Sequence, residues 1–116
     1  MNRQRAEAAG RQAEARAERW LVEQGWTVLA RRVRTPVGEI DLVCARSGTI
    51  AFVEVKWRRS AVALADAIDA SRLARVAAAV EAVAHQFATQ GEDVRIDVLL
   101  LAPGSPPHHI INAWQP

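Results

Sequence analysis

Apolar positions recur at two spacings along the chain, which predicts both helices and strands. Residues 3–24 are rich in Ala, Glu, Gln and Arg, all strong helix formers. Gly25 directly follows this segment and is a natural helix stop. One stripe at helical spacing, mostly of small residues, contains Ala13, Ala17, Trp20, Leu21 and Gln24. The pattern predicts a first helix that packs one face on a core.

Three strand-like segments follow the predicted helix. The first covers residues 26–30 and runs into an arginine cluster, and Pro36 is expected to end it. The second spans about residues 38–45 and the third about residues 50–57. Residues 46–49 between them are polar and contain glycine, as is typical of a hairpin loop.

The second half of the chain adds a helix and two strands. An Ala-rich connection at residues 60–68 leads to a helix that ends near residue 89. Its apolar face consists of Leu73, Val76, Ala77, Val80, Ala84 and Phe87. Residues 94–101 end in a continuous apolar run, which indicates a central strand, and residues 109–114 are expected to add an edge strand.

Length and composition restrict the class of protein. A chain of 116 residues, half of them apolar, is the size of a single domain, here 1–116. No apolar run is long enough to span a bilayer, and the charged N-terminus does not resemble a signal peptide. We therefore expect a cytoplasmic protein without membrane contact. The single cysteine, Cys44, is expected to be a small buried hydrophobe.

Charge is informative through its distribution, since the net charge is only +2. Basic residues cluster beside two strand-like segments, at Arg31, Arg32 and Arg34 and at Lys56, Arg58 and Arg59. Such patches can meet phosphate, although each alone is more often a solvated face. His108 and His109 fall in a proline-rich loop, where we expect exposed side chains without partners.

Charged and apolar residues alternate within the predicted hairpin. In its first strand, one face would carry Glu39, Asp41 and Val43, and the other Ile40, Leu42 and Cys44. In its second strand, one face would carry Phe52, Glu54 and Lys56, and the other Val53, Val55 and Trp57.

The hairpin register brings two acids together. If residues 46–49 form the loop, Asp41 faces Glu54, and Glu39 faces Lys56. Opposed carboxylates repel unless a cation lies between them, and carboxylate oxygens suit Mg²⁺ or Mn²⁺ more than zinc. An ammonium group beside such a metal can orient or deprotonate a water, or stabilise charge on a phosphate. A slip of one residue would separate the acids.

An ordinary half-exposed sheet explains the same alternation, with Glu39 and Lys56 as a cross-strand ion pair. Two observations favour a functional site. Asp41 lies mid-strand, where aspartate is a poor strand former. The acids also face each other instead of the available lysine.

The acid at Asp41 followed by Glu54-Val55-Lys56 resembles the signature of the PD-(D/E)XK nuclease superfamily, which is restriction-endonuclease-like and includes small Holliday junction resolvases. The resemblance is closer to the YraN/UPF0102 family of predicted endonucleases, and it spans nearly the whole chain. The matching blocks are Gly10-Arg11-Gln12-Ala13-Glu14, Gly38-Glu39-Ile40-Asp41-Leu42, Phe52-Val53-Glu54-Val55-Lys56-Trp57-Arg58, Ile96-Asp97-Val98 and Asn112-Ala113-Trp114.

The resemblance implies an α/β fold with a restriction-endonuclease-like αβββαβ core, whose mixed central sheet is flanked by helices. It implies a Mg²⁺- or Mn²⁺-dependent endonuclease acting on DNA, including branched or structured DNA. Asp41 and Glu54 would hold the metal with the Val55 carbonyl, and Lys56 would be the catalytic lysine. Glu14 would reach the metal through water. A surface glutamate on the first helix explains this position equally well.

The resemblance also assigns supporting residues. Glu39 would support the metal ligands without binding the metal itself, or would orient Lys56. Arg72 stands where the family usually has a lysine, and an arginine can grip phosphate but cannot act as a base. Arg34 and Arg58 would contact phosphate too, although a solvated face explains them nearly as well.

Two other functions compete with the nuclease. One is a nucleic-acid-binding protein of the same fold with little or no hydrolysis, and the other is a structural protein with an ion-pair ladder. A homodimer would let so small a domain act on two strands, with the edge strand at residues 109–114 as the candidate contact.

Overall fold

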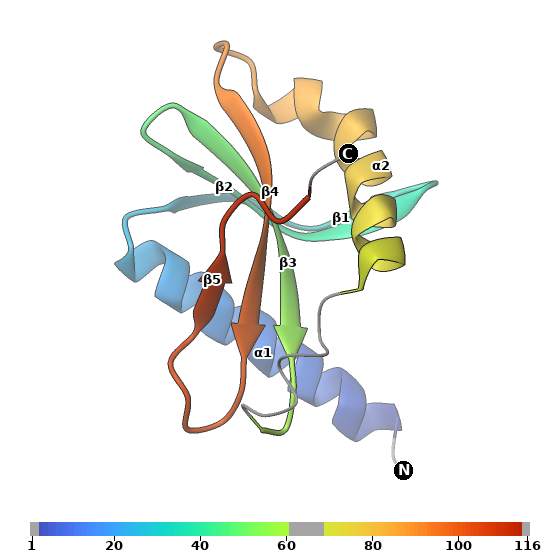
Figure 1. Cartoon of the computed structure of the whole chain (residues 1–116), viewed down its shortest axis with the longest axis vertical. Helices are drawn as coiled ribbons and strands as arrows, with labels where there is room; N and C mark the ends of the chain where they lie inside the picture. Colours follow the sequence, from blue (N-terminus) through green and yellow to red (C-terminus); the bar gives the residue numbers. More distant parts are fainter. Residues whose placement is uncertain (1–2, 61–68, 115–116) are drawn as a thin grey trace.

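The computed structural model describes residues 3–60 and 69–114, so the predicted connection at residues 60–68 lies outside the described residues except for Ser60. The elements are α1 (Arg3–Glu23), β1 (Thr27–Thr35), β2 (Gly38–Arg46), β3 (Thr49–Trp57), α2 (Ala70–Phe87), β4 (Asp93–Leu101) and β5 (His108–Ile110). This order confirms the predicted αβββαβ core with one added strand (Figure 1). In the described part of the chain, no helix is long and apolar enough to cross a membrane.

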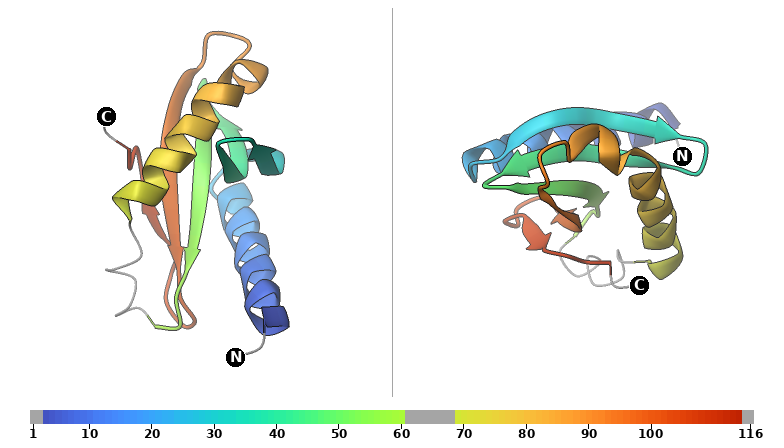
Figure 2. Two further views of the ribbon diagram at one scale, coloured as in Figure 1. Left: turned by 90° about the vertical axis from the view of Figure 1, so that its right-hand side faces the viewer. Right: turned by 90° about the horizontal axis from the view of Figure 1, so that it is seen from above.

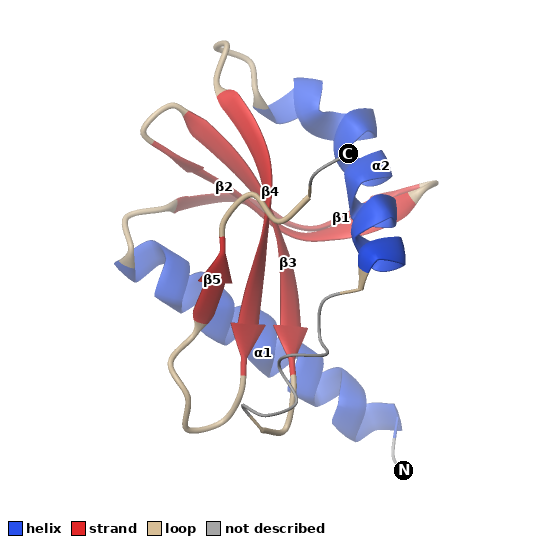
Figure 3. Ribbon diagram, in the orientation of Figure 1, coloured by secondary structure: helices blue, strands red, loops and turns tan. Residues whose placement is uncertain are grey.

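The strands form one five-stranded sheet in the order β1-β2-β3-β4-β5 (Figure 3). All neighbouring strands are antiparallel except β3 and β4, which are parallel and therefore need the long crossover that contains α2. Strand β4 lies between two neighbours, as its apolar run predicts. Strand β5 is an edge strand but is shorter than predicted, and Asn112 beyond it has a positive φ of 55°.

The two helices cover opposite faces of the sheet (Figure 2). Helix α2 packs on one face, and its buried residues are Leu73, Val76, Ala79, Val80 and Val83. Helix α1 packs on the other face through Ala13, Ala17 and Leu21. The predicted stripes are largely confirmed, although Gln24 is exposed because the helix ends before it, and Ala79 and Val83 were not predicted. Cys44 is buried, as expected.

The hairpin of β2 and β3 has the predicted register but a tighter turn. Only Ser47 and Gly48 form the turn, and both have positive φ, 48° and 79°, as a two-residue hairpin turn with matching twist requires. Strand pairing runs from Arg46 and Thr49 to Leu42 and Val53, and ends there.

Beyond that last pair, β2 leaves β3 and bends. Ile40 was predicted to share a face with Leu42, but it is buried in the α2-side cluster together with Val43. Arg32, which lies between the β1 residues paired with Leu42 and Ile40, has a positive φ of 49°. A local change of strand twist therefore breaks the simple alternation that the sequence predicts.

Gly38 lets α2 lie close to the start of β2. A Cβ atom at this position would lie 2.7 Å from the Arg75 carbonyl oxygen and 3.4 Å from the Ala79 Cβ. We predict that Gly38→Ala lowers the free energy of unfolding by about 1–3 kcal/mol, because backbone must move to admit the methyl group. Denaturant titration measures the change.

Gly10→Ala is the matched control, since a Cβ at Gly10 on α1 would meet nothing within 4 Å. It should be neutral or stabilise by about 0.5–1 kcal/mol. Equal stability of the two variants would contradict a close helix–strand approach at Gly38.

Candidate functional site

A cavity of about 380 Å³ opens where β2 separates from β3. Both helices and both strands contribute to it, and its lining residues are Glu14, Gly38, Glu39, Asp41, Glu54, Arg72, Arg75 and Val76. The structure thus brings together four acids and one arginine that the sequence singled out. Arg75 was missed, although its position three residues after Arg72 places it on the same side of α2.

The side chain of Asp41 bridges β2 and β3 just beyond the point where their backbone pairing ends. No backbone pair joins Asp41 to Glu54; instead, the Val55 N–H donates to the Asp41 Oδ2 at 2.7 Å. Burial and then the charge of Glu54 raise the pKa of Asp41 to about 7, against the lowering effect of this hydrogen bond. The two acids therefore lie close enough to oppose each other, as the register predicts.

Glu54 is almost fully buried and lies between two cations. Its Oε1 is 3.2 Å from the Lys56 Nζ and 3.2 Å from the Arg72 Nε. Lys56, the only lysine in the sequence, is also buried, and burial lowers its pKa while the neighbouring Glu54 charge partly restores it. An amine with a lowered pKa is better suited to exchange protons than an exposed lysine.

The predicted contact between Glu39 and Lys56 is wrong. The two strands have separated before that point, so Lys56 pairs with Glu54 on its own strand. Glu39 instead lies 3.9 Å from Arg34, with both side chains exposed. The alternative of a cross-strand Glu39–Lys56 ion pair is therefore not what the structure shows.

The side chain of Glu14 on α1 lines the cavity and contacts Arg32 on β1. Its Oε1 accepts a hydrogen bond from the Arg32 Nε at 2.8 Å. Its charge also contributes to the raised pKa of Asp41, so it lies near that acid.

The carboxylates fit a divalent cation only in part as they stand. Within residues 3–60 and 69–114, no three His, Cys, Asp or Glu side chains are grouped closely enough to hold a metal ion. Asp41 and Glu54 supply hard oxygen donors, and Mg²⁺ is commonly held by one or two carboxylates together with water and phosphate. Asp41 and Glu54 are therefore the two carboxylates that would hold Mg²⁺ or Mn²⁺, and water or phosphate would have to supply the other ligands.

Two of the predicted phosphate contacts do not line the cavity. The side chain of Arg34 is 79% exposed and faces Glu39. Arg58 is half-buried, and its Nη1 donates to the Trp57 carbonyl oxygen at 2.7 Å. Of the three predicted arginines, only Arg72 belongs to the cavity.

Comparison with known proteins gives the family of this chain. The sequence pattern of the Uncharacterised protein family UPF0102 matches residues 13–101. The chain belongs to the UPF0102 family. A UPF0102 protein of Erythrobacter litoralis (strain HTCC2594) is 62% identical over 116 residues, covering 100% of both chains. That of Sphingopyxis alaskensis is 54% identical over 116 residues, also with full coverage. That of Caulobacter sp. (strain K31) is 42% identical and covers 94% of this chain and 79% of its own.

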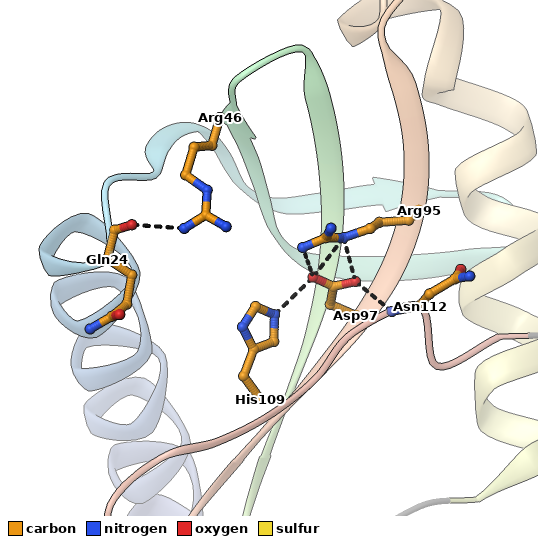
Figure 4. Close-up of polar contacts among 6 residues, drawn as sticks. All are labelled: Gln24, Arg46, Arg95, Asp97, His109 and Asn112. Atoms are coloured by element: carbon orange, nitrogen blue, oxygen red, sulfur yellow. Dashed lines mark hydrogen bonds and ion pairs between the residues drawn. The ribbon is translucent and has the colours of Figure 1, made fainter.

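Outside the cavity, this UPF0102 chain has a fully buried acid, Asp97 on β4, whose contacts were not predicted. Its carboxylate accepts hydrogen bonds from the Arg95 side chain and from the Asn112 N–H (Figure 4). The His109 Nε2 lies 2.8 Å from the Asp97 Oδ2, so the prediction of a partnerless His109 is wrong. The reason is that His109 lies in β5 beside β4, where its ring also packs edge-to-face on Trp20. This cluster ties the C-terminal segment to the sheet.

Asp41 and Asp97 differ in their titration. Burial raises the pKa of Asp97, but hydrogen bonds from His109, Asn112 and Arg95 outweigh it and hold the pKa below its usual value. The stability that Asp97 contributes is therefore present above about pH 4 and is lost as the pH falls through its native pKa. For Asp41 the contribution is fully present below about pH 4 and is lost as the pH rises through about 7.

We predict opposite effects of the matched variants Asp41→Asn and Asp97→Asn in a metal-free buffer at pH 7. Asp41→Asn should stabilise by about 1–2 kcal/mol, because it removes a charge that burial and Glu54 disfavour while leaving an oxygen for the Val55 N–H. Asp97→Asn should destabilise, because it weakens three charge-assisted contacts.

Denaturant unfolding between pH 4 and 8 checks both effects. The gain from Asp41→Asn should shrink toward pH 4, where the wild-type carboxyl group is already protonated. A gain that does not vary with pH would contradict the assignment of the raised pKa to Asp41.

Proposed function

We propose that this protein is a Mg²⁺- or Mn²⁺-dependent endonuclease that hydrolyses phosphodiester bonds in DNA. The observation that carries the proposal is that Asp41 and Glu54, two acids whose charges oppose each other, line one cavity, and that the buried Lys56 contacts Glu54. Buried like charges cost stability, and such an arrangement is typical of functional sites. The family resemblance points to the same chemistry.

Each residue has a distinct part in this proposal. Asp41 and Glu54 would hold the cation with the Val55 carbonyl, and Glu14 would reach it through water. The cation, when bound, would supply Lewis-acid activation of water and of the phosphate. Lys56, fixed by its contact with Glu54, would orient the attacking water or stabilise charge that develops on the phosphate. Glu39 also lines the cavity, and its negative charge would contribute to the electrostatic potential there.

Arginines would bind the nucleic acid around this centre. Arg72 lies at the cavity, and the exposed Arg34 and the half-buried Arg58 would add phosphate contacts outside it. Guanidinium groups bind phosphate oxygens in bidentate fashion, which positions a backbone without reading its sequence. A cytoplasmic location and a homodimer formed through the β5 edge belong to the proposal as well.

A DNA-binding protein with little hydrolysis is the second candidate. It is favoured by Arg72, which cannot act as a base where the family usually has a lysine, and by the absence of a three-acid metal cluster in the described ranges. The nuclease accounts better for the buried Lys56 and for the strained pair of acids.

Cleavage assays separate the candidates. The purified protein is incubated with linear, nicked and branched DNA in Mg²⁺ or Mn²⁺, beside Asp41→Asn and Lys56→Ala. We predict cleavage that each variant lowers by about 10²-fold or more, since each loses one part of the transition-state stabilisation. Gel electrophoresis of end-labelled DNA measures the rates.

Asp93→Asn is the matched control, since Asp93 is exposed at the start of β4 beside the hairpin turn. It should cleave at the wild-type rate. Metal-independent DNA binding without cleavage would support the second candidate, and cleavage unchanged in Asp41→Asn would overturn the assigned site.

A further inference from the structure

Every carboxylate at the centre of the cavity already has a partner from the chain. Asp41 accepts the Val55 N–H, and Glu54 lies between Lys56 and Arg72. Glu14 is held by Arg32. These contacts keep the acids apart as separate pairs, which agrees with the absence of a three-acid cluster in the described residues.

Two of these partners are exposed to solvent, and of the two only Arg72 lines the cavity itself. The side chain of Arg32 is 43% exposed and that of Arg72 is 60% exposed, whereas the side chain of Lys56 is only 10% exposed. An ion pair with one exposed arm is screened by solvent, and Lys56 remains beside Glu54 when Arg72 leaves. Arg32 and Arg72 can therefore leave their acids at low cost, while Lys56 stays.

The placement of Arg32 is costly to the backbone. Its φ of 49° lies in the left-handed region, which side chains other than glycine and asparagine seldom adopt. This residue lies in β1 at the point where β2 bends away from β3, and its guanidinium lies against Glu14. The charges of Glu39 and Asp41 also raise the pKa of Arg32, after the dominant effects of Glu14.

We propose that Arg32 and Arg72 are exchangeable counter-cations: DNA phosphate binds these arginines and thereby frees Glu14 and Glu54 for the divalent cation. The inference rests on the proposed function, and it makes metal binding and DNA binding mutually reinforcing. Each arginine contacts its carboxylate through Nε, and a phosphate that binds the same guanidinium in bidentate fashion competes with that carboxylate for it. Reciprocity of binding free energies requires that Mn²⁺ strengthen DNA binding by the same factor.

The first test measures Mn²⁺ affinity without DNA, by EPR detection of the free ion during titration. Arg32→Asn and Arg72→Gln should each bind Mn²⁺ about fivefold or more tightly than wild type, because an internal competitor is gone. Asparagine is chosen at position 32 because it tolerates a positive φ. Thermal unfolding without metal confirms that both variants are folded.

Arg75→Ala is the matched control for the local positive charge. Arg75 is exposed and lines the same cavity, but it forms no ion pair with a residue in the described ranges. Its removal should change Mn²⁺ affinity much less than removal of Arg32 or Arg72. An equal gain in all three variants would show a general field effect and would overturn the exchange.

The second test adds a short phosphorothioate duplex that resists cleavage. Wild-type Mn²⁺ affinity should rise about fivefold or more with the duplex, and the rise should be smaller in the Arg32→Asn/Arg72→Gln double variant. An equal rise in both proteins would overturn the exchange even if the protein cleaves DNA. Mn²⁺ that binds neither protein, with or without the duplex, would contradict the metal site and hence the proposed function too.

Discussion

The hydrogen bond from the Val55 N–H to the Asp41 carboxylate is the contact on which the rest of the site depends. Backbone pairing of β2 and β3 ends just before this bond, at Leu42 and Val53. The Asp41 carboxylate takes the place of a backbone carbonyl there, so the strands separate while the Val55 N–H keeps a hydrogen-bond acceptor. The separation opens the cavity and turns Ile40 into the α2-side core. It also moves Glu39 away from Lys56, which leaves the lysine to Glu54.

The same separation explains why both helices reach one site from opposite faces of the sheet. A continuous sheet would keep Glu14 on α1 apart from Arg72 on α2, but the gap between β2 and β3 is lined by both. Gly38 then sets how closely α2 approaches, because no side chain intervenes between its Cα and the Arg75 carbonyl. Site geometry is therefore a consequence of strand geometry and helix packing together.

Sequence periodicity predicts those parts of the fold in which each side chain follows the average rule for its element. The order of helices and strands, the hairpin register and the shared face of Glu54 and Lys56 are of this kind. The bend at Ile40 cannot be predicted from periodicity, because there the Asp41 side chain replaces a backbone carbonyl as the acceptor for the Val55 N–H. The contacts of His109 depend on the register in which β5 pairs with β4 across the proline-containing loop, and periodicity supplies no signal for that register.

The half-buried Asp41 and the fully buried Asp97 show how one residue type occupies two different electrostatic environments in a small domain. Asp97 is fully buried and its charge is compensated by Arg95, His109 and a backbone N–H, so ionisation holds the C-terminal segment in place. Asp41 has one N–H and three neighbouring acids that raise its pKa, so ionisation strains the fold. A domain with a modest stability margin retains such strain most readily where the charge has a use beyond folding. The contrast in compensation, more than burial itself, separates the acid of the proposed site from the structural one.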